Sequence, residues 1–212
     1  RPAGAQTSEG TQLTTPLSVG TGVRIVNTEK LYSQGGLATT DNALDVAIDG
    51  QGFLQVLLPD GQIGYTRDGA LSRNAEGTLT TASGYVVQPE IQIPDGAQEI
   101  IISADGIVSV TMPGATAAEE VGQITLAAFP NPRGLNPIGE NFVVESPASG
   151  PAVVGAPYTD GMGKLVQGAL EQSNVNVVQE LVDMIETQRA YEVNSKAISA
   201  VDGMLRFLNN NL

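Results

Sequence analysis

The stretch that decides the fold is Ser173-Asn174-Val175-Asn176-Val177, read together with everything that follows it to Leu212. From Val177 onward an apolar residue recurs at every seventh position, and further apolar residues lie three or four positions away. No proline interrupts this stretch, and Asn174 or Asn176 can cap its first turn. The pattern predicts one amphipathic helix over 175–212. Its subunit-interaction face is expected at Val177, Leu181, Met184, Ile185, Tyr191, Ile198, Val201, Leu205 and Leu208.

A helix of this length needs a partner surface, because most helical stability comes from burying the apolar face. Either it folds back on a β domain of its own chain, or it packs against helices of other chains, and the sevenfold spacing favours other chains. Gln188, Ser195 and Asp202 interrupt an ideal two-stranded seam. Gly203 marks a close contact or a local bend. These features predict a helix in a larger bundle or tube.

The composition excludes several classes of function. The 212 residues include 23 acidic and 10 basic side chains, for a net charge of −13, which disfavours nucleic acids and anionic membrane surfaces as partners. The chain has no Cys and no His, the usual thiolate and imidazole ligands. No apolar run reaches the roughly 20 residues needed to span a bilayer. We therefore expect no catalytic, cofactor or metal site, and no membrane insertion.

Short strands separated by turns fill the middle of the chain. Asp-Gly pairs between alternating segments are the strongest local signal for a hairpin. This pattern predicts a short-stranded antiparallel β domain, so the expected fold class is mainly β with a long C-terminal helix. The expected strands are 23–26, 44–48, 53–57, 64–67, 78–80, 85–88, 91–93, 99–102, 107–110, 124–129 and 142–144.

The ends of this β domain are expected to lie together. Residues 1–45 form an extended arm with linker strands, and 46–157 form the outer β domain. Residues 158–174 are a return linker that pairs with 23–48, and 175–212 are the helix. The first 22 residues, rich in Thr, Gly and Ser, are either a disordered tail or an arm that orders against neighbouring molecules through Leu13, Leu17 and Val19.

Three short motifs could suggest other chemistry. The Asp-Gly pairs lack the ligand spacing of a calcium loop and are interpreted as hairpin turns. Gly163-Lys164 lacks the rest of a phosphate loop, and Gly50-Gln51-Gly52 lacks the third glycine of a dinucleotide turn. An enzyme without His and Cys would need paired carboxylates, as glycosidases use.

The tail closely resembles the terminal signature of the bacterial flagellar rod and hook proteins. It runs Ser173-Asn174-Val175-Asn176, then Glu180-Leu181-Val182-Asp183-Met184-Ile185-Glu186-Thr187-Gln188-Arg189-Ala190-Tyr191-Glu192-Val193-Asn194-Ser195-Lys196-Ala197, then Asp202-Gly203-Met204-Leu205. Val46-Ala47-Ile48-Asp49-Gly50-Gln51-Gly52-Phe53 and Tyr65-Thr66-Arg67-Asp68-Gly69 look like the entry of that family into its β domain.

The arm refines the resemblance. Pro2-Ala3-Gly4-Ala5-Gln6-Thr7-Ser8-Glu9 and Gly20-Thr21-Gly22-Val23 are similar to the segment that distinguishes distal rod members from hook members. The N-terminal helix of the family, with its Asn-Asn-Leu-Ala-Asn-type motif, is absent from this sequence. We therefore expect about fifty further residues before it, by the family pattern.

The resemblance implies a structural role in the distal rod, with hook or proximal rod as alternatives. Many copies would stack helically, with terminal helices as the inner tube and β domains as the wall, and transmit torque from motor to hook. Implied partners are copies of the same chain, the proximal rod and hook proteins or a hook junction, the P- and L-ring bushing, and a rod cap. The implied location is the basal body, spanning the periplasm toward the outer membrane after type III export without a cleaved signal peptide.

Two readings from other classes stay open at the level of the sequence. One is a secreted glycan hydrolase or binder that uses clustered carboxylates. The other is a monomer whose helix packs on its own β domain. If the chain is a rod subunit, we expect its negative charge to lie mainly on the β domain.

Overall fold

The computed structural model describes residues 6–8, 11–12, 30–114 and 117–210. The chain divides into two compact units, Arg1–Leu31 and Tyr32–Leu212. In the first unit, β1 (Gln6–Ser8) pairs antiparallel with β2 (Thr11–Gln12). The expected anchors Leu13, Leu17 and Val19 and the expected strand 23–26 lie outside the described residues. The predicted domain boundaries remain a prediction.

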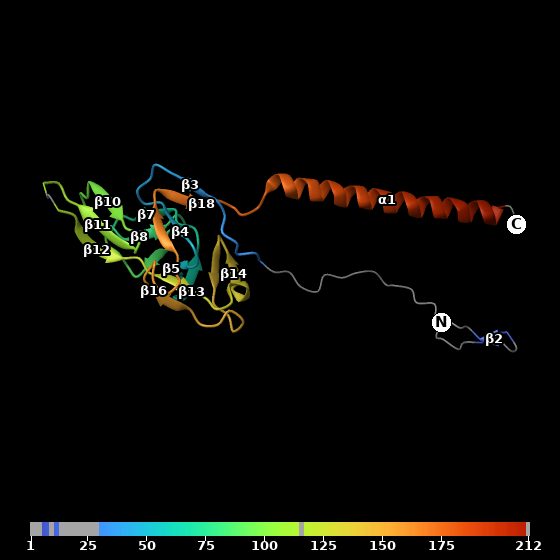
Figure 1. The fold of residues 1–212 in the computed structure, drawn as a ribbon, viewed down its shortest axis with the longest axis horizontal. Helices are drawn as coiled ribbons and strands as arrows, with labels where there is room; N and C mark the ends of the chain where they lie inside the picture. Colours follow the sequence, from blue (N-terminus) through green and yellow to red (C-terminus); the bar gives the residue numbers. More distant parts are fainter. Residues whose placement is uncertain (1–5, 9–10, 13–29, 115–116, 211–212) are drawn as a thin grey trace. The chain divides into compact units, whose positions relative to one another are not determined.

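The second unit consists of antiparallel strands and one long helix (Figure 1), so the predicted fold class is confirmed. A short 3-10 helix, η1 (Pro132–Gly134), interrupts the strands. The first strands are β3 (Leu37–Thr39), β4 (Val46–Asp49), β5 (Phe53–Leu57), β6 (Ile63–Thr66), β7 (Leu71–Arg73), β8 (Leu79–Thr81) and β9 (Val86–Gln88). The remainder are β10 (Glu99–Ile102), β11 (Ile107–Thr111), β12 (Glu119–Gln123), β13 (Leu126–Ala128), β14 (Asn136–Gly139), β15 (Phe142–Val144), β16 (Val153–Gly155), β17 (Lys164–Gln167) and β18 (Ala169–Glu171).

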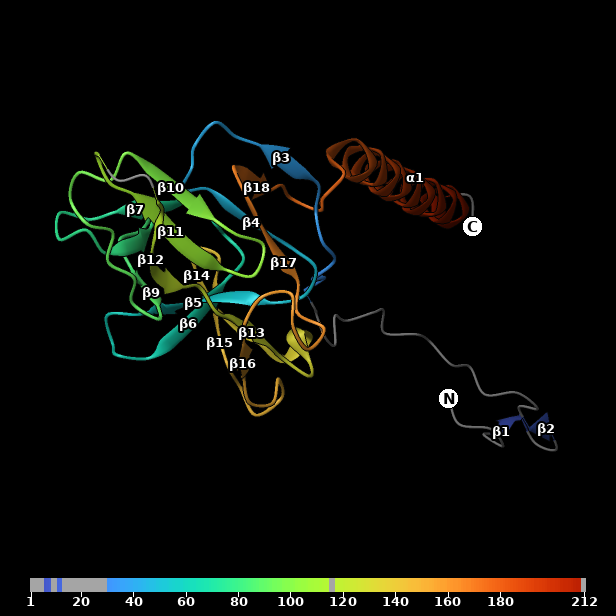
Figure 2. The same ribbon diagram turned by 60° about the vertical axis from the view of Figure 1, so that its left-hand side comes forward.

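The strands form one large sheet and several small ones. The nine-stranded sheet has the order β14-β15-β6-β5-β9-β8-β7, with β13 pairing both β5 and β16. A three-stranded sheet has the order β10-β11-β12. Figure 2 shows the two remaining pairs, β3 with β18 and β4 with β17, at the place where the chain enters and leaves the β strands.

Two apolar clusters pack against opposite faces of the large sheet. Side chains alternate between the faces of a strand, so neighbouring residues fall into different clusters: Phe53 and Leu54 in β5, and Val143 and Phe142 in β15. The larger cluster holds Leu54 and Phe142 and draws on most strands. The smaller one is rich in aromatic rings. It comprises Phe53, Tyr65, Ala127, Phe129, Leu135 and Val143, with Tyr32 and Ala152 packed against it.

Several Asp-Gly turns lie where the sequence predicts them. Asp60-Gly61 closes the hairpin of β5 and β6, and Asp105-Gly106 closes that of β10 and β11, with positive φ at both glycines. Asp68-Gly69 does not close a hairpin, because β6 and β7 do not pair with each other. Instead, the Gly69 carbonyl accepts from the Val46 amide, and a Cβ at Gly69 would lie 1.6 Å from the Val46 carbonyl oxygen. The glycine at this position allows two backbone segments to touch.

Other differences follow from composition. The sequence did not predict β12, which begins with two glutamates, or β14, which contains a proline. The sequence also did not predict β16, which lies close to several Pro, Gly and Ser residues. The expected strand 91–93 makes only one isolated bridge, between Gln92 and Thr78.

The return segment pairs with the entry segment through two short strands. β17 pairs with β4 over four residues and β18 with β3 over three, while Gly168 with positive φ separates β17 from β18. The side-chain amide of Gln167 then joins β17 to the free edge of β10. Its Nε2 donates to the Ile100 and Ala43 carbonyls, at 2.8 Å each, and its Oε1 accepts from the Ile102 amide at 3.1 Å. This side chain covers a strand edge that would otherwise be open to pairing.

The C-terminal element is α1 (Val177–Asn210), as the sequence predicts. Asn176 caps it, because its Oδ1 accepts from the amides of Val178 and Gln179 at 3.1 and 3.3 Å. The helix continues through Gly203, where a Cβ would meet no neighbouring atom within 4 Å, so the expected close contact is not made within this chain. Among the described residues, no helix combines the length and apolar character needed to cross a bilayer.

Replacing Gln167 tests the link between β10 and β17. Gln167→Ala removes three hydrogen bonds and leaves the amide of buried Ile102 without this acceptor, so we expect unfolding free energy to fall by about 2–3 kcal/mol. The matched control is Gln92→Ala, at an exposed glutamine, with an expected change within about 0.5 kcal/mol. Urea unfolding followed by circular dichroism measures both. Equal stability of the two variants would show that the Gln167 amide does not hold the sheets together.

Candidate functional site

The surface of α1 is left exposed by the residues that the structure describes. Every described side chain from Val177 to Phe207 is exposed, and its large apolar residues have exposed fractions between 44 and 77%. Packing of the helix on its own β domain is therefore not seen. Among the predicted interaction residues, Val177, Leu181, Met184, Ile185, Tyr191, Ile198, Val201 and Leu205 are exposed. The side chain of Leu208 lies outside those described.

The apolar residues do not form one straight stripe along α1. An α-helix has about 3.6 residues per turn, so residues eighteen apart lie on the same side, about five turns along. Most apolar positions in 177–186 have polar residues eighteen positions later, and polar positions there have apolar ones. The pairs are Val178 with Lys196, Leu181 with Ser199, Met184 with Asp202, Glu180 with Ile198, Asp183 with Val201, and Glu186 with Met204.

The helix therefore has two apolar faces, centred on opposite sides. The near face, within Val177–Ile185, comprises Val178, Leu181, Val182 and Ile185. The far face, within Tyr191–Phe207, comprises Ile198, Val201, Met204 and Leu205. The sequence analysis assigned a single face because the sevenfold row is regular. In a straight helix, however, residues seven positions apart are rotated about the helix axis by about 20° per heptad. The apolar residues beside the row therefore lie on different sides of the helix at its two ends.

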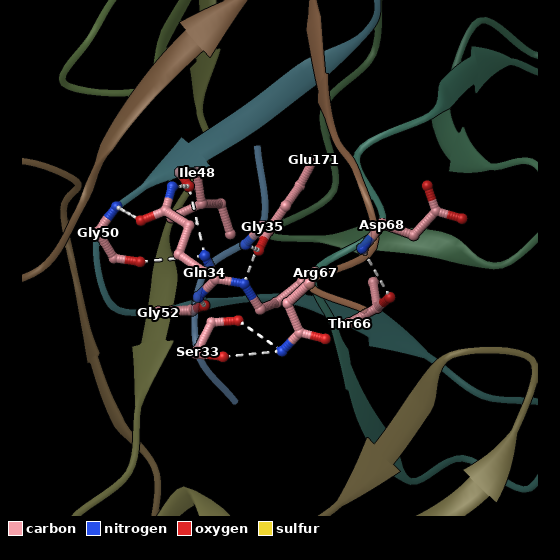
Figure 3. A network of polar contacts seen from close by, with 11 residues as sticks. Ser33, Gln34, Gly35, Ile48, Gly50, Gly52, Thr66, Arg67, Asp68 and Glu171 are labelled. Atoms are coloured by element: carbon pink, nitrogen blue, oxygen red, sulfur yellow. Dashed lines mark hydrogen bonds and ion pairs between the residues drawn. The ribbon is translucent and has the colours of Figure 1, made fainter. Parts of the chain in front are cut away.

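A network of polar contacts lies where the chain enters and leaves the β strands, and Arg67, directly after β6, is at its centre (Figure 3). The Arg67 Nε donates to the Glu171 carboxylate at 2.8 Å. Its Nη1 donates to the Gly52 carbonyl at 3.0 Å, and its Nη2 to the carbonyls of Gly50 at 3.1 Å and Ile48 at 3.3 Å. One guanidinium thus joins β18 to the turn between β4 and β5.

The Gly50-Gln51-Gly52 segment forms this turn. Gly50 and Gly52 have φ of 123° and 138°, which favour glycine, and a Cβ at Gly50 would lie 2.7 Å from the Gly163 Cα. The turn presents its carbonyls to Arg67. The motif that looks superficially like a nucleotide loop is therefore explained by a contact inside the β domain.

Glu171 connects the same guanidinium to the entry segment. Its Oε1 accepts from the Gly35 amide at 3.0 Å, while its Oε2 accepts from Arg67. Gln34 reinforces the contact, because its Nε2 donates to the Ile48 carbonyl at 2.9 Å and its Oε1 accepts from the Gly50 amide at 3.1 Å. Asn174 adds two contacts of 2.9 Å from its Nδ2 to the Ser33 carbonyl and hydroxyl oxygens. We call Ser33, Gln34, Gly35, Arg67, Glu171 and Asn174 the junction network.

The charged pair in this network is largely shielded from water. The Arg67 and Glu171 side chains are 20% and 13% exposed. A hydrogen bond to a charged group in such a setting contributes about 1.5–3 kcal/mol. Two further ion pairs of the β domain are more exposed: Lys164–Asp49 at 47% and 44%, and Arg73–Asp95 at 38% and 90%. Such exposed pairs contribute little.

An aromatic contact ties the entry segment to the same place. Tyr32 meets Phe53 edge-on at 5.9 Å between ring centroids, and the Arg67 guanidinium lies 5.9 Å from the centre of the Phe53 ring. A pocket of about 90 Å³ lies between them, lined also by Phe129 and Pro132. Burial raises the pKa of the Tyr32 phenol above its ordinary value. That hydroxyl has no hydrogen-bond partner among the described residues.

Sequence reasoning assigned no role in the junction network to any of its residues; it offered Asn174 only as a helix cap, a role that Asn176 fills. Arg67 lies in Tyr65-Thr66-Arg67-Asp68-Gly69, one of the two motifs that resemble the β-domain entry of the family. This resemblance pointed to the segment around Arg67 but not to its contacts. Glu171 gives no local signal, because its partners Arg67 and Gly35 lie 104 and 136 residues away. Within the described part of the chain, no three His, Cys, Asp or Glu side chains are placed to hold a metal ion.

Comparison with known proteins gives consistent matches over the chain. Residues 47–110 match the family model described as flagellar hook protein FlgE/F/G D1 domain, and 166–211 match flagellar basal body rod FlgEFG protein C-terminal. The chain is 52% identical over 209 residues to the flagellar basal-body rod protein FlgG of Buchnera aphidicola subsp. Schizaphis graminum, covering 99% of this chain and 80% of that protein.

More distant relatives follow the same pattern. The FlgG of Borreliella burgdorferi is 44% identical over 210 residues, covering 98% of this chain and 79% of that protein. The flagellar basal-body rod protein FlgF of Escherichia coli K12 is 35% identical over 175 residues, covering 79% of this chain and 68% of that protein.

Two neighbouring glycines test the geometry of the entry segment. A Cβ at Gly35 would lie 1.8 Å from the Gln172 carbonyl oxygen, so Gly35→Ala must push β3 and β18 apart and lower unfolding free energy by about 2 kcal/mol or more. Gly36→Ala is the control, since its nearest atom is the Gln172 Oε1 at 3.7 Å, and it should stay within about 1 kcal/mol of wild type. Urea titration decides; similar losses in both variants would contradict the close approach at Gly35.

The Tyr32 hydroxyl gives a prediction of opposite sign. Tyr32→Phe removes a buried, unpaired polar group and keeps the ring contact with Phe53, so stability should rise by about 1 kcal/mol. Tyr32→Ala loses the ring contact and should destabilise. Because burial raises the pKa of the phenol, wild-type stability falls as the pH rises above about 10, and this fall should be smaller in Tyr32→Phe. A clear loss of stability in Tyr32→Phe at pH 7 would mean that the hydroxyl has a partner.

Proposed function

Because the chain belongs to the FlgG family of flagellar basal-body rod proteins, we propose that it is a structural subunit of the distal rod. In this role it polymerises helically with its own copies in the basal body and transmits torque from motor to hook. The higher identity to FlgG proteins than to the FlgF relative favours the distal rod over the proximal rod.

The two-faced helix is the observation that carries this proposal. A helix whose apolar residues lie on two opposite sides is not buried by a single partner helix. It is buried when neighbours contact it on both sides, as they do in the wall of a tube. Contacts of this kind are heterologous, since different surfaces meet, and they propagate into a helical polymer when the rotation does not close. The helix thus has the surface of a tube element.

The charge distribution supports a division of labour between the helix and the β domain. Residues 32–176 contain 16 acidic and four basic side chains, a net charge of −12 out of −13 for the chain. The helix carries nearly balanced charge and the uncovered apolar surface. We propose that the helices form the inner tube and that the β domains form a hydrated, negatively charged outer wall. The arm, through Leu13, Leu17 and Val19, orders between neighbouring subunits.

The remaining partners follow from this position. At its ends the rod meets the proximal rod proteins and the hook or a hook junction, and a rod cap assists its growth. Its outer wall turns inside the P- and L-ring bushing, in the periplasm and toward the outer membrane. Subunits reach this location by export without a cleaved signal peptide. The protein has no catalytic role in this proposal, and nothing in its described carboxylates favours the glycan-hydrolase alternative.

Substitutions on each face of the helix test the proposal. Leu181→Asp on the near face and Ile198→Asp on the far face each place a carboxylate in a contact with a neighbouring subunit, so each should reduce rod assembly at least tenfold. The β domain should keep its thermal unfolding temperature. Assembly is measured by electron microscopy of basal bodies and by swimming in soft agar, in a strain that lacks its own distal rod protein.

Ser199→Asp is the matched control, because Ser199 lies on the same side of the helix as Leu181 but eighteen residues later, within a polar surface. It should support assembly as wild type does. Normal rods from Leu181→Asp or Ile198→Asp would show that the corresponding face is not an assembly surface. Failure of the wild-type chain to restore rods in this strain would contradict the distal rod itself.

A further inference from the structure

The connection between the β domain and α1 is unusually short. Asn174 is bonded to Ser33 within the junction network, and Asn176 already caps the helix. Only Val175 lies between these two residues. Its amide donates to the Ser173 hydroxyl at 3.2 Å, which restrains it further. Since each residue contributes only two soft backbone dihedrals, whatever fixes Asn174 also restricts the root of the helix.

The junction network holds both chain segments at this place. Gly35 from the entry segment and Glu171 from the return segment are bonded to each other, and the β3–β18 ladder continues the pairing with the Gln172 amide donating to the Gly36 carbonyl at 2.7 Å. Arg67 then ties this pair of segments to the carbonyls of the β4–β5 turn. Removing Arg67 would leave the two segments attached to each other but no longer fastened through Glu171 to the large sheet.

We propose that Arg67, acting through Glu171, is the positioning residue that fastens the roots of the arm and of α1 to the β domain. The mechanical part of this inference rests on the proposed function: in the rod, torque passes between the helical tube and the outer wall through the junction network. A polar link suits this task, because the five donors of a guanidinium lie in a fixed fork and fix direction as well as distance. An apolar contact of the same area resists separation but permits sliding.

Hydrogen exchange of the purified chain tests the fastening directly. In Arg67→Met and in Glu171→Ala, amides of 34–38 and 170–175 should exchange at least tenfold faster than in wild type, while amides of β5, β8 and β11 keep their rates. Arg73→Met is the matched control, since it removes an equivalent cation from the exposed pair with Asp95, and it should leave both regions unchanged. Unchanged exchange at 34–38 in both test variants overturns the proposal. If Arg67→Met fails to fold, Glu171→Ala still tests the proposal, because this variant keeps the contacts of Arg67 with the three carbonyls.

Assembly in cells then separates this inference from the proposed function. Arg67→Met and Glu171→Ala should still form rods, because the helix faces are intact, but swimming speed should fall at least twofold and the rods should bend in electron micrographs. Arg67→Lys keeps the charge without the fork and should rescue neither property fully. Straight rods and normal swimming, despite faster exchange, would overturn the mechanical role. Absence of rods with the wild-type chain as well would count against the proposed function, and the exchange result would stand on its own.

Discussion

The structure depends on one constraint: α1 carries large apolar side chains that the described residues of its own chain leave exposed. Burial of such residues is the main favourable term in folding and association, at roughly 25 cal/mol per Å² of apolar surface. Residues such as Tyr191 and Ile198, with exposed fractions of 77% and 71%, leave this term unused in the single chain. This surface supports the proposal that other molecules cover the helix, and its apolar faces on opposite sides would then take more than one neighbour.

The β domain differs from α1 in the burial of its apolar side chains. It buries many of its own apolar residues in two clusters on opposite faces of the large sheet. Its strands begin and end at the same place, where β3 and β4 pair with β18 and β17. A complete domain inserted between two chain segments leaves those segments free to serve assembly, provided that the place of insertion is rigid. The junction network supplies that rigidity.

The sequence predicted features that depend on neighbouring residues. The helix, its cap at Asn176 and the hairpins at Asp60-Gly61 and Asp105-Gly106 all follow from periods and turn residues within a few positions. The expectation that each Asp-Gly pair closes a hairpin was wrong at Asp68-Gly69, where the glycine instead allows close contact with the backbone of Val46. Strand β12 was missed because its sequence, Glu-Glu-Val-Gly-Gln, has no apolar alternation. Arg67 and Glu171 were beyond reach, since nothing local shows that residues 104 positions apart are partners. The resemblance located the motif around Arg67 but gave no contact.

The choice of an ion pair at the junction is itself informative. Replacing a shielded ion pair by apolar residues is often neutral or stabilising, so stability alone does not explain Arg67 and Glu171. What the pair adds is direction. Four acceptors, from Glu171, Gly52, Gly50 and Ile48, surround one guanidinium, so the carbonyl contacts hold the Arg67 fork in place and Glu171 bonds to a donor of fixed direction. Only Val175 lies between this place and the capped helix. We propose that the bond set restrains the direction in which the helix leaves the β domain, as a subunit that passes torque between a tube and a wall requires.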